Sequence, residues 1–266
     1  MRLYLASTSP ARLATLRAAG IEPVLLSSGV DEEAAVASAE ATVGAALTGP
    51  ELVLLLARLK AEAVVGRLVD GEPIDGVILG GDSAFELDGA IYGKPHLPEV
   101  ARERWLAQRG RSGMLHSGHW LIDHRATRVP EPPVPHSPAP ELVEGPAPQP
   151  QAPQSPVPEL VEGPAAQNLP AAGGVSTASV RFATSITDAE IDAYIATGEP
   201  LEVAGAFTID SLGGAFISEV RGDPHAVVGL SLALVRELLL GFDIPWTDLW
   251  NRPASTGSQA GSSAAL

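Results

Sequence analysis

The sequence predicts an α/β fold: a twisted, mixed sheet flanked by helices, with two lobes around a central cleft and a long disordered insertion. Segments typical of strands alternate with segments typical of helices along most of the chain. The 266 residues are 45% hydrophobic, which is enough to bury the core of one large domain or of two lobes. Fourteen of the 24 prolines fall between residues 130 and 170, and this stretch interrupts the alternation.

The N-terminal segment carries clear boundary signals. Residues 3–6 are predicted to form a strand, and residues 11–19 a helix. Ser9 is the expected N-cap of that helix, Pro10 suits its first position, and Gly20 is a stop signal. A strand therefore delivers a turn of small hydroxyl residues directly to a helix N-terminus.

The next segments build the predicted sheet. Residues 50–69 place their apolar side chains on one face and are predicted as a helix. The apolar run 76–79 is predicted as a buried strand that breaks at Gly80-Gly81-Asp82, and residues 84–91 as a hairpin that turns at Asp88-Gly89. The remaining elements of this half are a helix over residues 98–108 and a strand over 114–123.

A proline-rich segment then separates two parts of one predicted domain. It repeats the sequence Pro-Glu-Leu-Val-Glu-Gly-Pro and contains five Glu but no Lys or Arg. Such composition is typical of a disordered or polyproline-like insertion, and a segment that docks a partner protein is the alternative. The predicted boundaries are 1–128 and 175–250 for the two parts of the domain, 129–174 for the insertion, and 251–266 for a disordered tail.

The C-terminal part continues the alternation. A strand is predicted over residues 179–182, and Thr187-Asp-Ala-Glu190 has the capping-box pattern of a helix that extends to about residue 196. Residues 213–220 alternate as a strand does. The last helix, residues 231–241, has a strongly apolar face that should pack on the sheet.

Composition excludes several classes of function. The net charge of −15 argues against binding of a nucleic-acid backbone, which needs a basic surface. No apolar run approaches the roughly 20 residues of a membrane-spanning helix. Cysteine is absent, so disulfides and thiolate sites are excluded. These observations favour a cytoplasmic protein that binds neither nucleic acid nor membrane.

The turn from Ser7 to Arg12 is the first candidate for chemistry. A helix N-terminus presents free N–H groups and the positive end of the helix dipole, which suits phosphate. Arg12 would add a guanidinium fork for phosphate oxygens. For this motif alone, an ordinary capped helix is the more common interpretation.

Asp82 is the second candidate, because it follows a glycine pair at the predicted carboxyl end of a buried strand, where α/β sheets open their ligand crevice. A carboxylate there can accept a proton from water or bind a metal ion. A turn-forming Asp is an equal alternative. Lys60 and Lys94 would supply local positive charge for an anion, although single lysines are usually solvated surface groups.

Two further groups suggest metals. Glu32 and Glu33 offer carboxylate oxygens for Mg²⁺, although an acidic loop is the more common explanation. His116 and His119 have a spacing that suggests zinc. Residues three apart on a strand point to opposite faces, so a zinc site is not predicted.

Several motifs in the same order resemble the Maf family of nucleotide pyrophosphatases, over nearly all of the chain outside the insertion and the tail. They are Leu5-Ala-Ser-Thr-Ser-Pro-Ala-Arg12, Val30-Asp-Glu32, Leu56-Ala-Arg-Leu-Lys60-Ala, Gly81-Asp-Ser83, Asp88-Gly89, Gly93-Lys-Pro95, Ile191-Asp-Ala-Tyr194, Gly198-Glu-Pro200, Ala204-Gly-Ala-Phe207 and Val227-Val-Gly-Leu230. The resemblance implies cleavage of a nucleoside triphosphate between its α and β phosphates. A homodimer is also plausible on this basis.

The resemblance also implies roles for individual residues. Asp82 would be the general base, and Glu32 and Asp82 would bind a divalent cation, Mg²⁺ or Mn²⁺. The substrate-binding residues would be Ser7, Arg12, Lys60 and Lys94. A regulator of cell division that binds nucleotide without turnover is the alternative function.

Three positions bear on the choice of base. Ala11 and Ser83 stand where the branch of the family that prefers dTTP and UTP has a second Arg and a Thr, and that branch has a Gln near Asp210. Another branch of the family acts on 7-methyl-GTP. By that resemblance, Asp210 could pair with the N–H edge of a guanine. The nucleotide preference therefore stays open.

Overall fold

The computed structural model describes residues 1–125 and 169–251. The strands are β1 (Leu3–Ala6), β2 (Val24–Leu25), β3 (Leu68–Val69), β4 (Glu72–Pro73), β5 (Gly76–Leu87), β6 (Ala90–Tyr92), β7 (Ser112–His124), β8 (Ala171–Phe182) and β9 (Ile217–Arg221). The α-helices are α1 (Pro10–Ala18), α2 (Glu32–Val43), α3 (Gly49–Glu62), α4 (Pro98–Gln108), α5 (Asp188–Ala196), α6 (Pro224–Val228) and α7 (Leu232–Leu240). The main sheet has seven strands in the order β2-β1-β5-β7-β8-β9, with β6 paired to β5. The predicted α/β class is confirmed.

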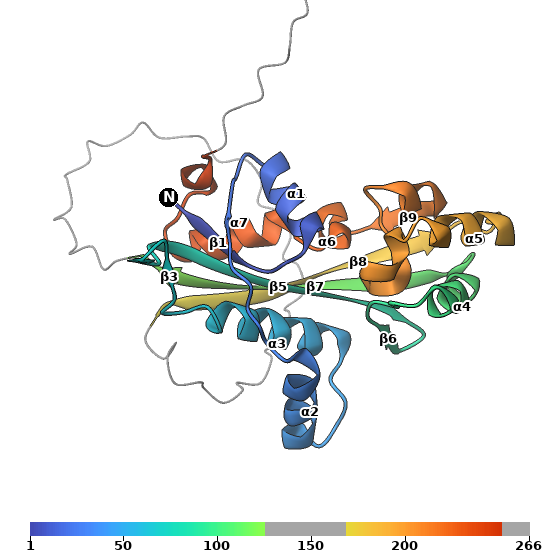
Figure 1. The fold of residues 1–266 in the computed structure, drawn as a ribbon, viewed down its shortest axis with the longest axis horizontal. Helices are drawn as coiled ribbons and strands as arrows, with labels where there is room; N and C mark the ends of the chain where they lie inside the picture. Colours follow the sequence, from blue (N-terminus) through green and yellow to red (C-terminus); the bar gives the residue numbers. More distant parts are fainter. Residues whose placement is uncertain (126–168, 252–266) are drawn as a thin grey trace, which may run out of the picture.

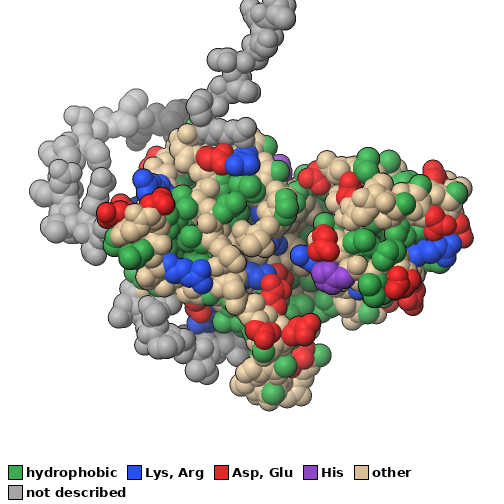
Figure 2. Space-filling model, viewed as in Figure 1, with side chains coloured by type: hydrophobic (Ala, Val, Ile, Leu, Met, Phe, Trp, Pro, Cys, Tyr) green, Lys and Arg blue, Asp and Glu red, His purple; other side chains and the backbone are tan. Residues whose placement is uncertain are grey.

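Helices cover both faces of this sheet (Figure 1). One face carries α1, α6 and α7, the other carries α3, and α4 and α5 lie at one end of the molecule. In the space-filling view, α2 stands out from the body beyond α3 and carries acidic side chains (Figure 2). The described residues contain no helix that is both long and apolar enough to cross a membrane.

The buried side chains form three clusters. One cluster is aliphatic and packs the sheet against α1 and α7, with Leu5 and Leu239 among its members. A second lies between the sheet and α3 and includes Ile78. The third is aromatic: Trp105 of α4 packs edge to face on Phe182 of β8, with ring centroids 5.4 Å apart. This separate aromatic cluster holds together the part of the molecule that contains α4 and α5, which we call the outer lobe.

Several elements begin or turn where the local sequence predicted. The side chain of Ser9 caps α1, and Pro10 occupies its first turn. Thr187 and Glu190 form the predicted capping box of α5. The β5–β6 hairpin turns at Asp88 and Gly89, both with positive φ, as a tight two-residue turn requires.

The prediction that the buried strand breaks at Gly80-Gly81-Asp82 is wrong. β5 continues through these residues to Leu87 and pairs with β7 along the way. Gly80 is needed for close packing, because a Cβ at this position would lie 2.0 Å from the carbonyl oxygen of Ala57 in α3. The glycine pair therefore serves the approach of other elements to the strand and leaves the strand itself intact.

Three other elements also differ from the prediction. The helix predicted over residues 50–69 ends at Glu62, and Gly66 with a φ of +77° leads into β3. Helix α2 was not predicted, because none of its residues is buried and its apolar periodicity is weak. Residues 212–216 form a short 3₁₀ helix, and the strand predicted over 213–220 is only Ile217–Arg221.

The strand predicted over residues 179–182 is also longer than expected. β8 begins at Ala171, which pairs with Ile122 of β7, so residues 171–174 belong to the sheet and not to the insertion. The ends of β7 and β8 are therefore neighbours in an antiparallel pair. The predicted disorder of the proline-rich segment and of the tail falls largely on residues 126–168 and 252–266, outside the described residues.

Candidate active site

The candidate site lies at a gap along one edge of β5. The opposite edge of β5 is paired with β7 over residues 76–86. The edge of β5 that contains the gap is paired with two short strands. β1 pairs with residues 77–80 and β6 pairs with residues 85–87. Within the described sheet, residues 81–84 therefore have no strand beside them on that edge, and we call this gap the edge window. The chain leaves β1 beside the window and turns through Ser7 into α1.

Arg12 is held at the window by three hydrogen bonds. Its Nε donates to the carbonyl oxygen of Gly229 at 2.9 Å, Nη1 donates to Ser7 Oγ at 3.1 Å, and Nη2 donates to Ser83 Oγ at 2.9 Å. The residue is buried. Gly81 leaves room for it, because a Cβ there would lie 3.1 Å from Arg12 Nε. The guanidinium is thus fixed by groups from three distant parts of the sequence.

Lys60 joins two carboxylates on the other side of the strand. Its Nζ lies 2.7 Å from Asp82 Oδ1 and 2.7 Å from Glu32 Oε1. Successive residues of a strand face opposite sides, so Asp82 points toward α3, which carries Lys60, while Ser83 points toward α1. Glu32 comes from the first turn of α2, which explains its position without the acidic loop considered from the sequence.

Burial sets the electrostatics of this cluster. Removal from water raises the pKa of Asp82 above its usual value, although the positive charges of Lys60 and Arg12 oppose the shift. Burial also lowers the pKa of Arg12, while Asp82 and Glu32 favour its charged form. Lys60 and Asp82 therefore face each other with little solvent between them, Glu32 is half exposed, and Asp82 is the carboxylate whose pKa is shifted toward neutrality.

The structure thus brings together six of the predicted site residues: Ser7, Arg12, Glu32, Lys60, Asp82 and Ser83. Lys94 lies apart from them, in the loop between β6 and α4. It is about half exposed, and its Nζ lies 3.9 Å from Glu202. Among the described residues, no contact joins Lys94 to the Asp82 cluster, so its predicted role in substrate binding stays a prediction.

The three positions linked to base preference lie in different settings. Ala11 is the second residue of α1 and is partly buried, and Asp210 is exposed on the loop before residues 212–216. Ser83 is in contact with Arg12 at the window. Only Ser83 therefore has a partner in the site.

His116 and His119 face opposite sides of β7, as the strand geometry predicted. His116 contacts Glu86 and Thr177. His119 accepts a hydrogen bond from the backbone N–H of Ser231 at 3.0 Å, and burial lowers its pKa to about 3, so this imidazole is neutral. The two side chains cannot share a zinc ion.

The donor set at the window suits a hard divalent cation. Glu32 and Asp82 converge on the same ammonium group, so their oxygens are near neighbours. Among the described residues, no group of three or more His, Cys, Asp or Glu side chains could hold a metal ion. Two protein carboxylates fit Mg²⁺, which takes its other ligands from water and phosphate. Glu32 also borders a groove of about 400 Å³ between α2 and α3.

Sequence reasoning missed two residues of the site. Ser117 of β7 lies behind Ser83, at 2.9 Å between the two hydroxyl oxygens, and no local signal distinguished it. Gly229 follows α6 with a φ of +111°, and a Cβ there would lie 3.2 Å from Ser83 Oγ. The signal for Gly229 was its place in the motif Val227-Val-Gly-Leu230, where a glycine ends a helix.

Comparison with known proteins agrees with the family resemblance of the sequence motifs. The sequence profile of the family described as Maf-like protein matches residues 2–134 and 161–242. A nucleoside triphosphate pyrophosphatase of Leifsonia xyli is 59% identical over 252 residues, which are 95% of this chain and 98% of that protein. Proteins of the same name from Salinispora tropica (44% identical, 99% of this chain and 94% of that protein) and Cutibacterium acnes (41% identical, 94% of each) are also similar.

Proposed function

The chain belongs to the Maf-like protein family, and on that premise we propose that it is a nucleoside triphosphate pyrophosphatase that cleaves its substrate between the α and β phosphates. The observation that carries this proposal is the ionic cluster at the edge window. A largely buried carboxylate with a raised pKa lies 2.7 Å from Lys60 and close enough to the fixed guanidinium of Arg12 for their charges to interact. This arrangement can bind phosphate and activate water in the same place.

The substrate would be gripped through its phosphates. A guanidinium has five N–H groups, of which Arg12 uses three within the described protein. Nη1 and Nη2 each keep one N–H, and such a pair suits two oxygens of one phosphate. The hydroxyl of Ser7 accepts from Arg12 and from the backbone N–H of Ser9, so its own proton is left for a phosphate oxygen.

The chemistry follows from the position of Asp82. Its carboxylate would take a proton from a water molecule as the water oxygen forms a bond to the α phosphorus. The bond from that phosphorus to the bridging oxygen breaks, and pyrophosphate leaves with the bonding electrons. Negative charge grows on the phosphoryl oxygens, where Arg12 and Lys60 would stabilise it.

A divalent cation completes the charge balance. The two cations of the cluster are already matched by Glu32 and Asp82, and a triphosphate brings several further negative charges. Glu32 and Asp82 are the residues that would hold Mg²⁺ or Mn²⁺. When bound, the ion would neutralise phosphoryl charge.

The net charge of −15 favours a small nucleotide over a nucleic-acid backbone as the partner. A cytoplasmic location and a homodimer remain predictions from the composition and the family resemblance. Base preference, with Ala11, Ser83 and Asp210 as its predicted determinants, also remains a prediction.

The proposal is tested by hydrolysis in water labelled with heavy oxygen. Purified protein is incubated with a panel of nucleoside triphosphates and Mg²⁺ or Mn²⁺, and the products are analysed by mass spectrometry. We expect the label in the nucleoside monophosphate, because attack at the α phosphorus puts the water oxygen there. A chelator in excess of the metal should stop the release of pyrophosphate.

Other outcomes would reject specific parts of the proposal. Label in the pyrophosphate would show attack at the β phosphorus. Inorganic phosphate with a diphosphate as products would show cleavage of the terminal bond. Tight binding of a triphosphate with no turnover at all would favour the alternative of a nucleotide-binding regulator.

A further inference from the structure

A chain of hydrogen bonds runs from Arg12 into the interior of the protein. Nη2 of Arg12 donates to Ser83 Oγ at 2.9 Å, the hydroxyl oxygens of Ser83 and Ser117 are 2.9 Å apart, and Ser117 Oγ donates to the carbonyl oxygen of Ala226 at 2.7 Å. We call these four groups the serine relay. It connects α1, β5, β7 and α6.

The direction of every bond in the relay is fixed by proton count. A serine hydroxyl has one proton. The carbonyl oxygen of Ala226 can only accept, so the proton of Ser117 is committed to it. The proton between the two serines must then come from Ser83, whose remaining lone pairs are free to accept from Arg12.

The relay is rigid because its inner end is buried. Ser117 is fully buried, and Ala226 is fully buried in α6. Ser83 and Ser117 are directly paired residues on β5 and β7, so their side chains share one face of the sheet. Gly229, at the end of α6, accepts from Arg12 Nε at 2.9 Å. The same short helix therefore orients the guanidinium both directly and through the two serines.

We propose that Ser117 is a positioning residue for Arg12, acting through Ser83, so that this serine pair orients the guanidinium that binds the phosphates. The proposal rests on the proposed function, because it assigns Arg12 to the triphosphate. With its proton donated to Ser117, Ser83 has no donor left for a nucleobase. Loss of the relay should therefore weaken the use of all triphosphates to the same degree.

The test compares Ser117→Ala with Ser176→Ala. Ser176 of β8 is paired directly with Ser117 and stands outside the relay, so it is a control on the same face of the sheet, although it is only partly buried. Values of kcat and KM are measured for four triphosphates with different bases, together with Tm. We expect kcat/KM of Ser117→Ala to fall about tenfold for every base, as for loss of a hydrogen bond to a charged group, while Ser176→Ala stays near the wild type.

A double-mutant cycle separates positioning from general damage. Lysine at position 12 keeps the charge but has no fork, so the relay has nothing to orient. In the Arg12→Lys background, we expect Ser117→Ala to cost less than about a further twofold in kcat/KM. Ser117→Cys, which replaces the hydroxyl with a slightly larger group that is a weaker donor, should behave as Ser117→Ala does in the native background.

Three results would overturn the proposal: wild-type kinetics of Ser117→Ala, a loss that differs strongly from one base to another, or full additivity with Arg12→Lys. Failure of the proposed function is recognised separately, by the absence of pyrophosphate release from the wild type. In that case the relay is judged by calorimetric binding of a non-hydrolysable triphosphate analogue. Weaker binding by Ser117→Ala than by Ser176→Ala supports the relay, and equal binding rejects it.

Discussion

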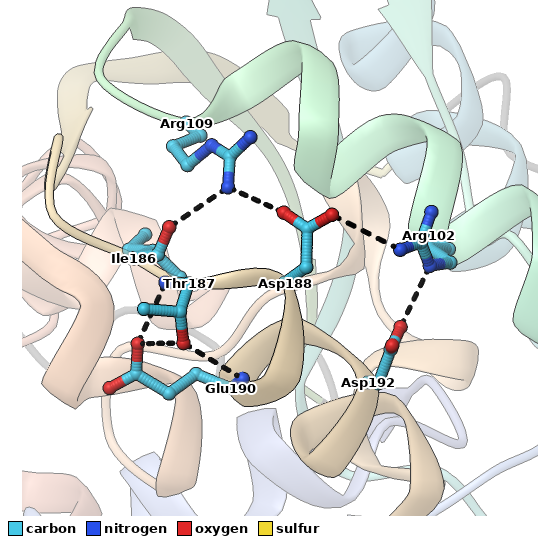
Figure 3. A network of polar contacts seen from close by, with 7 residues as sticks. All are labelled: Arg102, Arg109, Ile186, Thr187, Asp188, Glu190 and Asp192. Carbon is cyan, nitrogen blue, oxygen red and sulfur yellow. Dashed lines mark hydrogen bonds and ion pairs between the residues drawn. The ribbon is translucent and has the colours of Figure 1, made fainter.

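Two ionic clusters of this protein have the same charges, but their aspartates have pKa values shifted in opposite directions. Each contains two cations and two carboxylates. The cluster at the edge window holds Arg12, Lys60, Glu32 and Asp82. The cluster of the outer lobe links α4 to α5 and holds Arg102, Arg109, Asp188 and Asp192 (Figure 3).

Burial accounts for the difference. At the window, the side chains of Lys60 and Asp82 are only 10% and 14% exposed, and burial raises the pKa of Asp82. In the outer lobe, Asp188 is 58% exposed, and its hydrogen bond from Arg109 lowers the pKa of its carboxyl. Water screens the outer cluster, whose ion pairs only tie two helices together. Around Lys60 and Asp82 the inner cluster has much less of this screening, although Glu32 is half exposed, and this is where we propose that the chemistry takes place.

Removal of one carboxylate from each cluster should give the largest contrast. Asp82→Asn takes away the proposed base and is expected to lower kcat by roughly 10²- to 10⁴-fold, with little loss of Tm. Asp192→Asn, the control in the outer lobe, should leave kcat unchanged. The measurement is pyrophosphate release at saturating triphosphate. Equal rates for Asp82→Asn and the wild type would remove Asp82 from the mechanism.

Removal of one cation is expected to have the next largest effect. Lys60→Gln should lower kcat/KM by about 10²-fold, as does loss of a charge-stabilising donor in other active sites. Because Lys60 lowers the pKa of Asp82, the acid limb of the pH profile should also move to higher pH in this variant. Arg102→Gln, the matched change in the outer cluster, should alter neither quantity. An acid limb that stays in place would show that Asp82 is not the group that titrates.

Some features of both regions were predictable from the sequence. Ser9, Thr187 and the Asp88-Gly89 turn were predictable because capping and tight turns depend on a few adjacent residues. Asp82 was also identified, but for a partly wrong reason. The strand does not end there, and the opening is created by the end of β1 and the start of β6 on the neighbouring edge.

Long-range contacts explain what the sequence did not predict. Arg12 and Gly229 are 217 positions apart, and no local pattern indicates that one accepts from the other. The need for Gly80 arises from Ala57 in a packed helix. For α2, a signal was available in the Asp31 N-cap and the acidic first turn, but the exposed helix lacks the apolar stripe that would have confirmed it.

In the wild type, activity and stability should depend on pH in opposite ways around the pKa of Asp82. Ionised Asp82 is required for proton abstraction, so kcat/KM should fall as pH decreases through its raised pKa, at a pH above the usual 3.8 of an aspartate. Stability should respond in the opposite sense. Between 3.8 and the raised value the folded protein binds more protons than the unfolded chain, so this group's contribution to stability decreases as pH rises through that window.

Activity and unfolding profiles over an acidic pH series measure both effects. In Asp82→Asn, the part of the stability change that belongs to this window should disappear. An acid limb at or below 3.8 would contradict the burial effect described for Asp82.

The smallest effect is expected from Asp188 in the outer cluster, and its sign is reversed. Its pKa is lowered in the folded protein, so its contribution to stability is complete above the unfolded value of 3.8 and is lost as pH falls through the folded value. Asp188→Asn should therefore lower Tm slightly at neutral pH and not at all in strong acid, because exposed ion pairs contribute little. Activity should be unaffected at either pH. A large loss of kcat in this variant would show that the outer lobe does more than hold α4 against α5, and that exposure alone does not separate the two clusters.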